Sequence, residues 1–385
     1  MGRIKKLCSI LLLAVLVAMA LCTLSACNIK DLKNGTALHK DGVYYTVYAF
    51  KRYAIVHGFD AKEGAQVYEI PSHVKHKGFK YPVKRFAPEN NNYSFYMYDI
   101  VAGGYPKELV VPETLESLQL SWYNDEQVDA LQKITVDANN KHYTSVDGVV
   151  YTKDKSALVF YPPAKVSNSL LLPKETTNIR DMLGVKERLS SIAVEAGNKV
   201  FSAKDGVMFN ADGSKIVCYP LNKTDETYTI PSTLTVLSTN CFASNKHLKY
   251  FEVEAGNPVF SSYKGNLYSV DGSILLYRQR SEGLNVLELS DNIKTIGRNL
   301  LQKVDILYVP KGLDRIVFDK YNNYYGYSDE NDENPISQVK YLYFEGDEVP
   351  FCLRYAELTQ NVKFGVTREQ FEAEMEELIS RGEQL

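Results

Sequence analysis

The sequence predicts a mainly β fold, a solenoid of stacked hairpin and strand units that ends in a short C-terminal helix. One pattern of residues occurs three times at almost constant spacing, which is typical of repeat proteins. Short segments of alternating apolar and polar residues lie between Asp-Gly pairs and prolines, as strands lie between turns. Tyrosine occurs 28 times against a single Trp, a composition that suits large half-buried sheet surfaces.

The repeated pattern covers three stretches, Val136–Pro162, Val194–Pro220 and Val253–Arg278. The second stretch starts 58 residues after the first, and the third starts 59 residues after the second. One hairpin with its strand cannot bury its apolar side alone, whereas stacked copies form a continuous core. The spacing therefore predicts a stack of similar units.

Turn residues and strand ends recur with the same period. The pairs Asp147–Gly148, Asp205–Gly206 and Asp212–Gly213 predict tight turns, which need residues with positive φ. A short apolar strand follows each hairpin and ends near proline, which has no backbone N–H to donate. We expect such strands to end at Pro71, Pro112, Pro173, Pro231 and Pro310, with Leu287–Ser290 as a degenerate member.

The first 26 residues have the pattern of a secretory signal peptide: basic residues, an apolar run from Leu7 to Leu24, and small residues before Cys27. The tetrad Leu24–Cys27 resembles the lipobox of bacterial lipoproteins. That resemblance implies cleavage before Cys27 and diacylglyceryl modification of its thiol. Two alternatives stay open, a plain signal peptide with a coincidental cysteine and an uncleaved transmembrane anchor, for which the apolar run is marginal.

Acyl chains on Cys27 would hold the protein at a membrane surface, since each buried methylene contributes about 0.8 kcal/mol. Asn28, rather than Asp, follows the cysteine, and the lipoprotein sorting rule then favours the outer membrane in a cell that has one. The predicted location is thus a cell membrane or outer membrane, outside the cytoplasm.

The chain divides by these signals into a signal peptide (1–26), a lipid-anchored polar tether (27–40), the solenoid (41–365) and a C-terminal capping helix (366–385). Thr367 and Gln370 match a capping box at the start of that helix. Phe371, Met375, Leu378 and Ile379 then recur at helical spacing. We expect the helix to close the last open edge of the stack.

Composition excludes several classes of protein. The formal net charge is −3, and loss of Arg3, Lys5 and Lys6 with the signal peptide takes it to −6, so nothing resembles a nucleic-acid-binding footprint. Of the six cysteines, Cys218, Cys241 and Cys352 would remain unmodified. Three is an odd number, and packing rather than a disulfide framework must hold the fold.

The repeat landmarks are similar to those of BspA-like leucine-rich-repeat proteins of bacterial surfaces. They include Ile230–Pro231, Cys241–Phe242, Leu248–Val253, the Gly-Asn pairs and the Tyr-Pro pairs, and they extend over residues 41–365. They are weak at 85–130 and 315–335, where the repeat register stays open. The resemblance implies a leucine-rich-repeat-type solenoid and attachment to host or neighbouring-cell proteins, or scaffolding at the cell surface.

Two aromatic clusters lie in those weak segments among asparagines, and Tyr with Asn suits adaptable recognition of protein or glycan surfaces. The alternative is that their rings pack on the flank of the solenoid. The candidate ligand-binding residues are Tyr93, Tyr96 and Tyr98 in one cluster, with Phe95 beside them, and Tyr321, Tyr324, Tyr325 and Tyr327 in the other.

Residue patterns for catalysis or for a cofactor are not found, and the sequence predicts a non-catalytic protein without cofactor or metal. His73 and His76 are close enough for half a metal site, but a loop with solvated cations is the preferred interpretation. The acidic segment 329–334 could attract calcium, yet it lacks EF-hand spacing and is interpreted as a solvated loop. Cys218 takes the repeat position of Phe160 and Tyr277, so we expect it in the core.

The sequence therefore predicts a lipid-anchored surface protein that recognises a protein partner, on a host or on the same cell, through a solenoid surface. A glycan-binding module for nutrient capture or cell-wall association is the alternative. The predicted partners are a membrane, through the N-terminal lipid, and a protein, with glycan possible and nucleic acid excluded.

Overall fold

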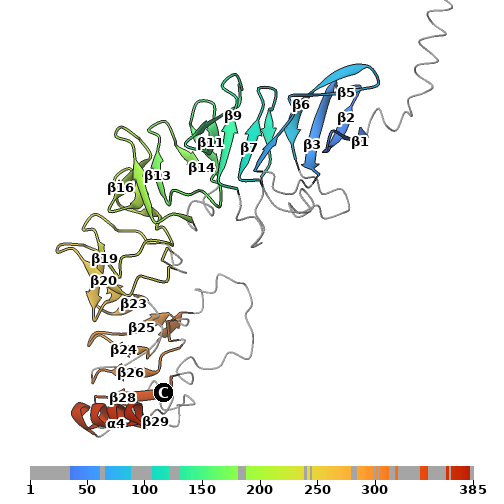
Figure 1. Cartoon of the computed structure of the whole chain (residues 1–385). Helices are drawn as coiled ribbons and strands as arrows, with labels where there is room; N and C mark the ends of the chain where they lie inside the picture. Colours follow the sequence, from blue (N-terminus) through green and yellow to red (C-terminus); the bar gives the residue numbers. More distant parts are fainter. Residues whose placement is uncertain are drawn as a thin grey trace, which may run out of the picture. The chain divides into compact units, whose positions relative to one another are not determined.

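The structure is a computed structural model, and Figure 1 shows the course of the chain. It describes residues 35–60, 66–87, 106–120, 131–180, 188–237, 241–242, 245–278, 284–297, 300–301, 303–311, 317–319, 339–345, 361–363 and 366–381. The chain divides into two compact units. The N-terminal unit is Met1–Ser167 with Glu175–Val185, and the C-terminal unit is Asn168–Lys174 with Lys186–Leu385.

The N-terminal unit contains β1–β12 and β14. Their bounds are β1 Thr36–Lys40, β2 Val43–Tyr48, β3 Tyr53–Phe59, β4 Val67–Glu69, β5 His73–His76, β6 Phe79–Phe86, β7 Glu108–Val111, β8 Ser117–Leu118, β9 Lys133–Val136, β10 Tyr143–Val146, β11 Val149–Thr152, β12 Ala157–Phe160 and β14 Asn178–Ile179. Three sheets form, β1-β2-β3-β6-β5 with β8 beside β6, parallel β4-β7-β9, and β10-β11-β12-β14.

The C-terminal unit contains β13, β15–β29 and helix α4. Their bounds are β13 Ser169–Leu172, β15 Ser191–Val194, β16 Phe201–Lys204, β17 Val207–Asn210, β18 Ile216–Cys218, β19 Thr227–Ile230, β20 Tyr250–Val253, β21 Phe260–Tyr263, β22 Asn266–Ser269, β23 Ile274–Tyr277, β24 Val286–Glu288, β25 Thr295–Gly297, β26 Ile306–Val309, β27 Val317–Asp319, β28 Tyr341–Phe344, β29 Asn361–Lys363 and α4 Arg368–Ser380. Parallel pairing joins β13-β15, β19-β20 and β24-β26-β28-β29.

Two local expectations near the N-terminus are wrong. Residues 36–40 of the predicted tether form β1, with Thr36 opposite Val47, because even a polar segment can pair at a sheet edge when one side chain, Leu38, reaches the core. The predicted loop around His73 and His76 is strand β5, paired with β6. Its buried Val74 fixes the register of that hairpin.

The predicted repeat is confirmed by equivalent hydrogen bonds in successive units. The hairpin tip lies against the first residues of the preceding parallel strand, with Ile134 N donating to Gly148 O at 3.0 Å and Phe251 N donating to Gly265 O at 2.7 Å. Glycine is required at this tip for two reasons. Gly148 has φ of 77°, and a Cβ there would lie 2.7 Å from Lys133 Cβ.

The recurrent Asn and Pro landmarks are two ends of one contact. The buried Asn257 side chain donates from Nδ2 to the carbonyls of Pro231 and Leu234, at 2.8 and 3.0 Å. Its Oδ1 accepts from the backbone N–H groups of Val259 and Phe260. Asn140 bonds in the same way to Pro112 and Leu115, two periods earlier. A proline-ended strand leaves carbonyls that the next asparagine satisfies, so the two residue types recur together.

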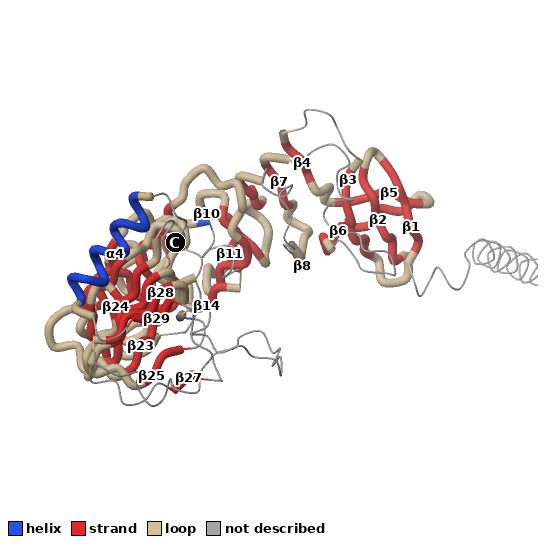
Figure 2. Tube along the Cα trace, turned by 90° about the horizontal axis from the view of Figure 1, so that it is seen from below, coloured by secondary structure: helices blue, strands red, loops and turns tan. Residues whose placement is uncertain are grey.

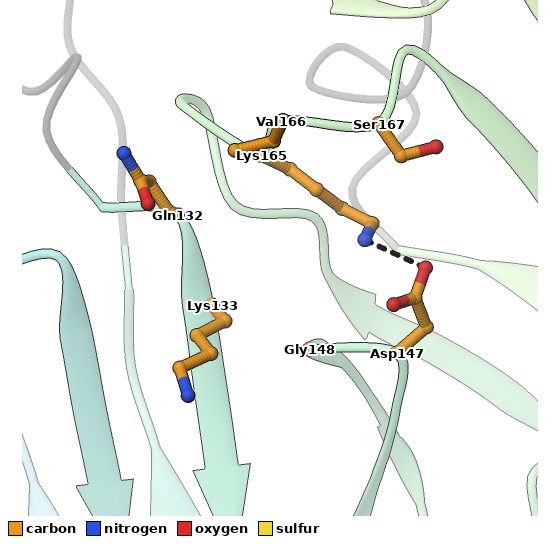
Figure 3. A pocket seen from close by; sticks show the side chains of 7 residues that line it. All are labelled: Gln132, Lys133, Asp147, Gly148, Lys165, Val166 and Ser167. Carbon is orange, nitrogen blue, oxygen red and sulfur yellow. Dashed lines mark hydrogen bonds and ion pairs between the residues drawn. The ribbon is translucent and has the colours of Figure 1, made fainter.

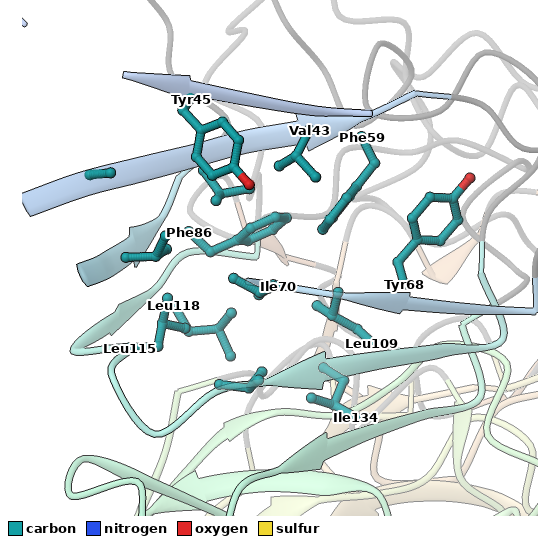
Figure 4. Packing of buried hydrophobic residues seen from close by; sticks show 14 of the residues in the cluster. Val43, Tyr45, Phe59, Tyr68, Ile70, Phe86, Leu109, Leu115, Leu118 and Ile134 are labelled. Carbon is teal, nitrogen blue, oxygen red and sulfur yellow. The ribbon is translucent and has the colours of Figure 1, made fainter. Parts of the chain in front are cut away.

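Alternate residues of each parallel strand point inward and form the cores. In the N-terminal unit, Figure 4 shows Tyr68 on β4, Leu109 on β7 and Ile134 on β9 in one cluster with Phe59 and Phe86. Predicted core positions are confirmed at Cys218, which is buried and registered with Met208 as Phe160 is with Val150. Cys241 is also buried, and Cys352 lies outside the described residues.

Helix α4 follows the predicted N-terminal signature but not its predicted position. The Thr367 side chain accepts from Gln370 N, and the Gln370 side chain accepts from Thr367 N, which completes the capping box. We expected the helix to lie across the open edge of the stack, whereas its Phe371 and Met375 pack on the outer face of β26 and β28. Figure 2 shows α4 beside β24 and β28. In the described part of the chain no helix is long and apolar enough to span a bilayer.

Candidate functional site

The residues singled out from the sequence as sites lie outside the described part of the chain. These are the lipidation residue Cys27 and the candidate ligand-binding tyrosines Tyr93, Tyr96, Tyr98, Tyr321, Tyr324, Tyr325 and Tyr327. The acidic segment 329–334 lies outside it too. A site must therefore be built from surfaces that sequence reasoning did not single out, and the outward residues of the parallel strands are the first of them.

In the N-terminal unit these outward residues form a charged ladder. Glu108 on β7 pairs with Lys133 on β9, with 2.8 Å between Oε2 and Nζ, and Thr135 donates to the same carboxylate at 2.5 Å. Both bonds lower the pKa of Glu108, and the bond from Lys133 has the larger effect. Val67 on β4 lies opposite Glu108 and is exposed. The ladder thus combines fixed charges with an apolar side chain open to solvent.

A shallow pocket of about 460 Å³ adjoins this ladder at Lys133 (Figure 3). The Lys165 ammonium, whose side chain is largely buried, binds the exposed carboxylate of Asp147 at 2.7 Å. Val166 is 86 % exposed at the rim. The lining residues are Gln132, Lys133, Asp147, Gly148, Lys165, Val166 and Ser167. This lining offers two cations, one carboxylate, an amide and an apolar contact.

In the C-terminal unit the outward residues are less charged. Leu171 on β13 is 58 % exposed, and Tyr250 on β20 and Val286 on β24 are about half exposed. Glu252 and Thr229 lie on the same side of β19-β20 and are hydrogen-bonded to each other at 3.3 Å. Isolated exposed apolar side chains are ordinary on a protein surface, so this side offers separate apolar contacts and hydrogen bonds rather than one continuous apolar patch.

Helix α4 covers the outward side of β26 and β28. Ile306 and Tyr308 of β26 and Tyr343 of β28 bury against Phe371 and Met375 of the helix. The Phe371 ring lies 5.6 Å from the Tyr308 ring and 5.2 Å from the Tyr343 ring, between centroids. The surface open to a partner in this unit therefore excludes β26 and β28.

An ion pair fixes the start of α4. Arg368 binds Glu288 of β24 through two hydrogen bonds, and Tyr263 donates to the same carboxylate at 2.9 Å. The bonds from Arg368 are the main reason that the pKa of Glu288 is lowered. Burial and the bond to Glu288 raise the pKa of Tyr263 to about 12. Glu374, also on α4, forms a second ion pair with Lys363 of β29, with 2.8 Å between Oε1 and Nζ.

Other shifted carboxylates hold turns rather than a reacting group. Asp154 accepts from the N–H and hydroxyl groups of Ser156, and Asp271 accepts chiefly from the Ser269 hydroxyl and then from the N–H and hydroxyl groups of Ser273, which holds the pKa of each at about 2. The pKa of Glu254 is also about 2, chiefly because Lys204 binds it at 2.7 Å. Structural hydrogen bonds explain these values fully.

The described residues contain no group of three or more His, Cys, Asp or Glu side chains placed to hold a metal ion. His57 binds the Ala87 carbonyl and the Thr46 hydroxyl, and His73 binds Ser72, so both have structural partners. The pocket lining contains Ser167 but no His, and the Lys165 ammonium there is bound to the Asp147 carboxylate. The groups that these surfaces present are charges, hydrogen-bonding groups and apolar side chains.

No protein-family model and no curated protein matches the chain. Similar solved structures include the pneumococcal vaccine antigen PcpA, 16 % identical, over 86 % of this chain and 99 % of that one, with a TM-score of 0.44. A leucine-rich cell surface protein from Faecalibacterium prausnitzii A2-165 is 12 % identical over 88 % and 97 %, with a TM-score of 0.38. A leucine-rich-repeat protein from Eubacterium ventriosum is 16 % identical over 86 % and 87 %, with a TM-score of 0.33.

At these identities and TM-scores, the assignment of the fold depends on the chain's own geometry. Parallel strands one repeat apart, inward side chains at alternate positions and asparagines that bind the preceding strand end are all present. This geometry is that of a mainly β repeat fold of the leucine-rich-repeat type, the fold that the sequence landmarks predict.

Proposed function

We propose that this chain is a surface protein, held to a membrane by lipid on Cys27, that binds a protein partner without catalysis through the outward sides of its parallel strands. The observation that carries the proposal is the ladder of β4-β7-β9 with its adjoining pocket. There the exposed Val67 lies opposite Glu108, and the exposed Val166 lines the pocket together with Lys133 and Asp147. Apolar side chains with a polar and charged rim are the arrangement found in protein–protein interfaces, which supports a protein as the partner.

The binding experiment uses residues 28–385. Every residue of the core clusters lies between Val43 and Met375, so this chain retains the whole described core. Immobilised extracellular matrix proteins and a glycan array are screened side by side. Saturable binding to a protein supports the proposal, and saturable binding to a glycan alone contradicts it in favour of glycan capture. A protein of the same cell is sought by crosslinking on intact cells.

Variants locate the binding surface. Lys133→Glu and Val166→Asp should weaken the interaction about tenfold or more, because each places an unpaired charge at the expected contact. Val270→Asp is the matched control, since Val270 is exposed as Val166 is but lies in the turn after β22. Equal affinities for wild type and all three variants would contradict the assignment of the surface.

The lipid is tested separately. Cys27→Ala should abolish incorporation of labelled fatty acid and leave an uncut precursor or a released protein. The control is Cys218→Ala, which removes a buried thiol and should leave labelling intact. Unchanged labelling of the Cys27→Ala protein would refute the anchor.

A further inference from the structure

The first described residues lie beside one particular turn. Strands β1 and β2 are antiparallel with Thr36 opposite Val47, so the start of β1 and the β2–β3 turn share one end of the sheet. Gly35 packs against Tyr48 so closely that a Cβ on it would lie 3.1 Å from the Tyr48 ring. The chain therefore enters the fold next to the turn Ala49–Arg52, which Tyr48 and Tyr53 close as a registered pair.

The side chains of this turn are unusual for a surface loop. Phe50 is 82 % exposed at its tip. Lys51 and Arg52 follow and are exposed as well. The half-buried rings of Tyr48 and Tyr53 stack below them with centroids 5.1 Å apart. The Lys51 ammonium lies 5.4 Å from the Tyr48 ring centroid.

Charge is distributed unevenly along this sheet. The sequence from Gly42 to Phe59 contains no acidic residue. The two flanking carboxylates, Asp41 and Asp60, lie at the far end, where Asp60 N donates to Gly42 O and His39 binds the Asp60 carboxylate. The end that carries Phe50 is consequently cationic, aromatic and apolar.

We propose that the β2–β3 turn is a membrane-contact site for the anionic headgroup region of the bilayer that holds the chain's own lipid. Phe50 enters the boundary of the acyl chains, Tyr48 and Tyr53 lie at headgroup level, and Lys51 and Arg52 bind lipid phosphates. The site rests on the proposed anchor at Cys27. Eight peptide steps separate Cys27 from Gly35 and span at most about 28 Å, so the anchor keeps the turn near the surface.

Each group suits that place in a bilayer. Tyrosine rings concentrate at membrane interfaces, where one end is apolar and the other is hydrated. A lysine or arginine near an anionic surface gains roughly fivefold in partitioning, and its long stem lets the charge reach phosphate while the ring beside it stays buried. A diacylglyceryl anchor holds the chain at the membrane but does not by itself orient the folded part, so a second contact of this kind would fix the orientation of the first sheet.

The test uses the full lipidated chain with its only Trp replaced, Trp122→Phe, and one new indole at the turn, Phe50→Trp. The protein is reconstituted on vesicles of phosphatidylcholine with or without about 30 % phosphatidylglycerol, with and without brominated acyl chains that quench indole fluorescence. Phe79→Trp in the same background is the matched control. Phe79 is 63 % exposed and flanked by Lys80, but it lies in the β5–β6 hairpin.

We expect brominated chains to lower the fluorescence of the Phe50→Trp protein about twofold on anionic vesicles and to change that of the Phe79→Trp protein by less than about a tenth. Lys51→Gln with Arg52→Gln should remove most of the dependence on anionic lipid. If the Phe50→Trp protein floats with vesicles but its fluorescence is not quenched, the membrane-contact site is refuted while the anchor stands. If the Phe79→Trp protein is quenched as strongly as the Phe50→Trp protein, the assignment of the site to the β2–β3 turn is refuted. A chain that does not float with vesicles refutes the anchor and the site with it.

Discussion

Arg368 and Glu288 are 80 residues apart in sequence and form a bidentate ion pair that joins α4 to β24, with N–O distances of 3.1 and 2.9 Å. The guanidinium also lies 4.7 Å from the Tyr308 ring centroid. Only 17 % of the Glu288 side chain is exposed, while Arg368 is about half exposed. The pair thus fixes the N-terminal end of the helix at the margin of the covered side.

Removal of Arg368 should loosen the helix before it unfolds the unit. Arg368→Ala should lower the free energy of unfolding by about 1–2 kcal/mol, since it leaves the largely buried Glu288 carboxylate with one fewer partner, while the exposure of Arg368 limits the loss. Hydrogen exchange of α4 amides should accelerate more than that of β26. Lys249→Ala, which breaks an exposed pair with Glu226, is the control and should cost less than about 0.5 kcal/mol. Unchanged exchange in α4 would contradict the role of the pair.

The same pair predicts a dependence on pH. The pKa of Glu288 in the folded protein is below its ordinary value of 4.5, mainly through Arg368. The stabilisation from Glu288 is therefore complete above pH 4.5 and is lost as the pH falls through the lowered pKa. Urea titrations at a series of pH values should show wild type and Glu288→Gln converging in acid. A constant difference between them down to about pH 2 would count against this account.

The asparagine contact should be among the costliest polar contacts to lose. Asn257→Ala leaves two carbonyls and two N–H groups without their side-chain partner, and should lower the free energy of unfolding by about 2–4 kcal/mol. Asn292→Ala removes one exposed bond, to the Asp271 carbonyl, and should cost less than about 0.5 kcal/mol. Chemical denaturation measures both variants, and equal losses would show that burial of the asparagine does not matter.

Two tyrosines one repeat apart should respond oppositely to loss of the hydroxyl. The Tyr161 hydroxyl donates to the Ser167 carbonyl at 2.9 Å, whereas the buried Tyr219 hydroxyl has no hydrogen-bond partner among the described residues. Tyr161→Phe should therefore destabilise by about 1 kcal/mol, and Tyr219→Phe should be neutral or stabilise by a similar amount. Thermal and urea unfolding of both proteins tests the contrast, which a loss of stability in Tyr219→Phe would overturn.

Most of the repeat was predictable because its signals are local. Asp147 and Gly148 adopt the left-handed conformation that their turn requires, with φ of 49° and 77°. At Asp212–Gly213 only the glycine does so, although both residues were expected to. Strand β7, in a segment with weak landmarks, was found through its proline end and pairs in register with β4 and β9.

The candidate surfaces were harder to predict because they combine residues from distant segments. Lys133 and Asp147 meet Lys165 at one pocket only after separate segments of the chain are stacked. A signal for the covered side was nevertheless present. Ile306–Val309 and Tyr341–Phe344 are apolar at every position, as strands covered on both sides are. The signal is not specific, because Ile274–Tyr277 is equally apolar and its Ile274 and Leu276 are exposed.

The sequence by itself determined the period of the repeat, the turns, the inward residues and the capping box of α4, because each depends on neighbours a few residues away. Only the tertiary structure decided where α4 lies. The apolar stripe of Phe371 and Met375 fits any apolar surface, and the choice of Tyr308 and Tyr343 over the open edge depends on side chains brought together from β24, β26 and β28. Packing between distant segments is a property of the assembled stack, which no local pattern encodes.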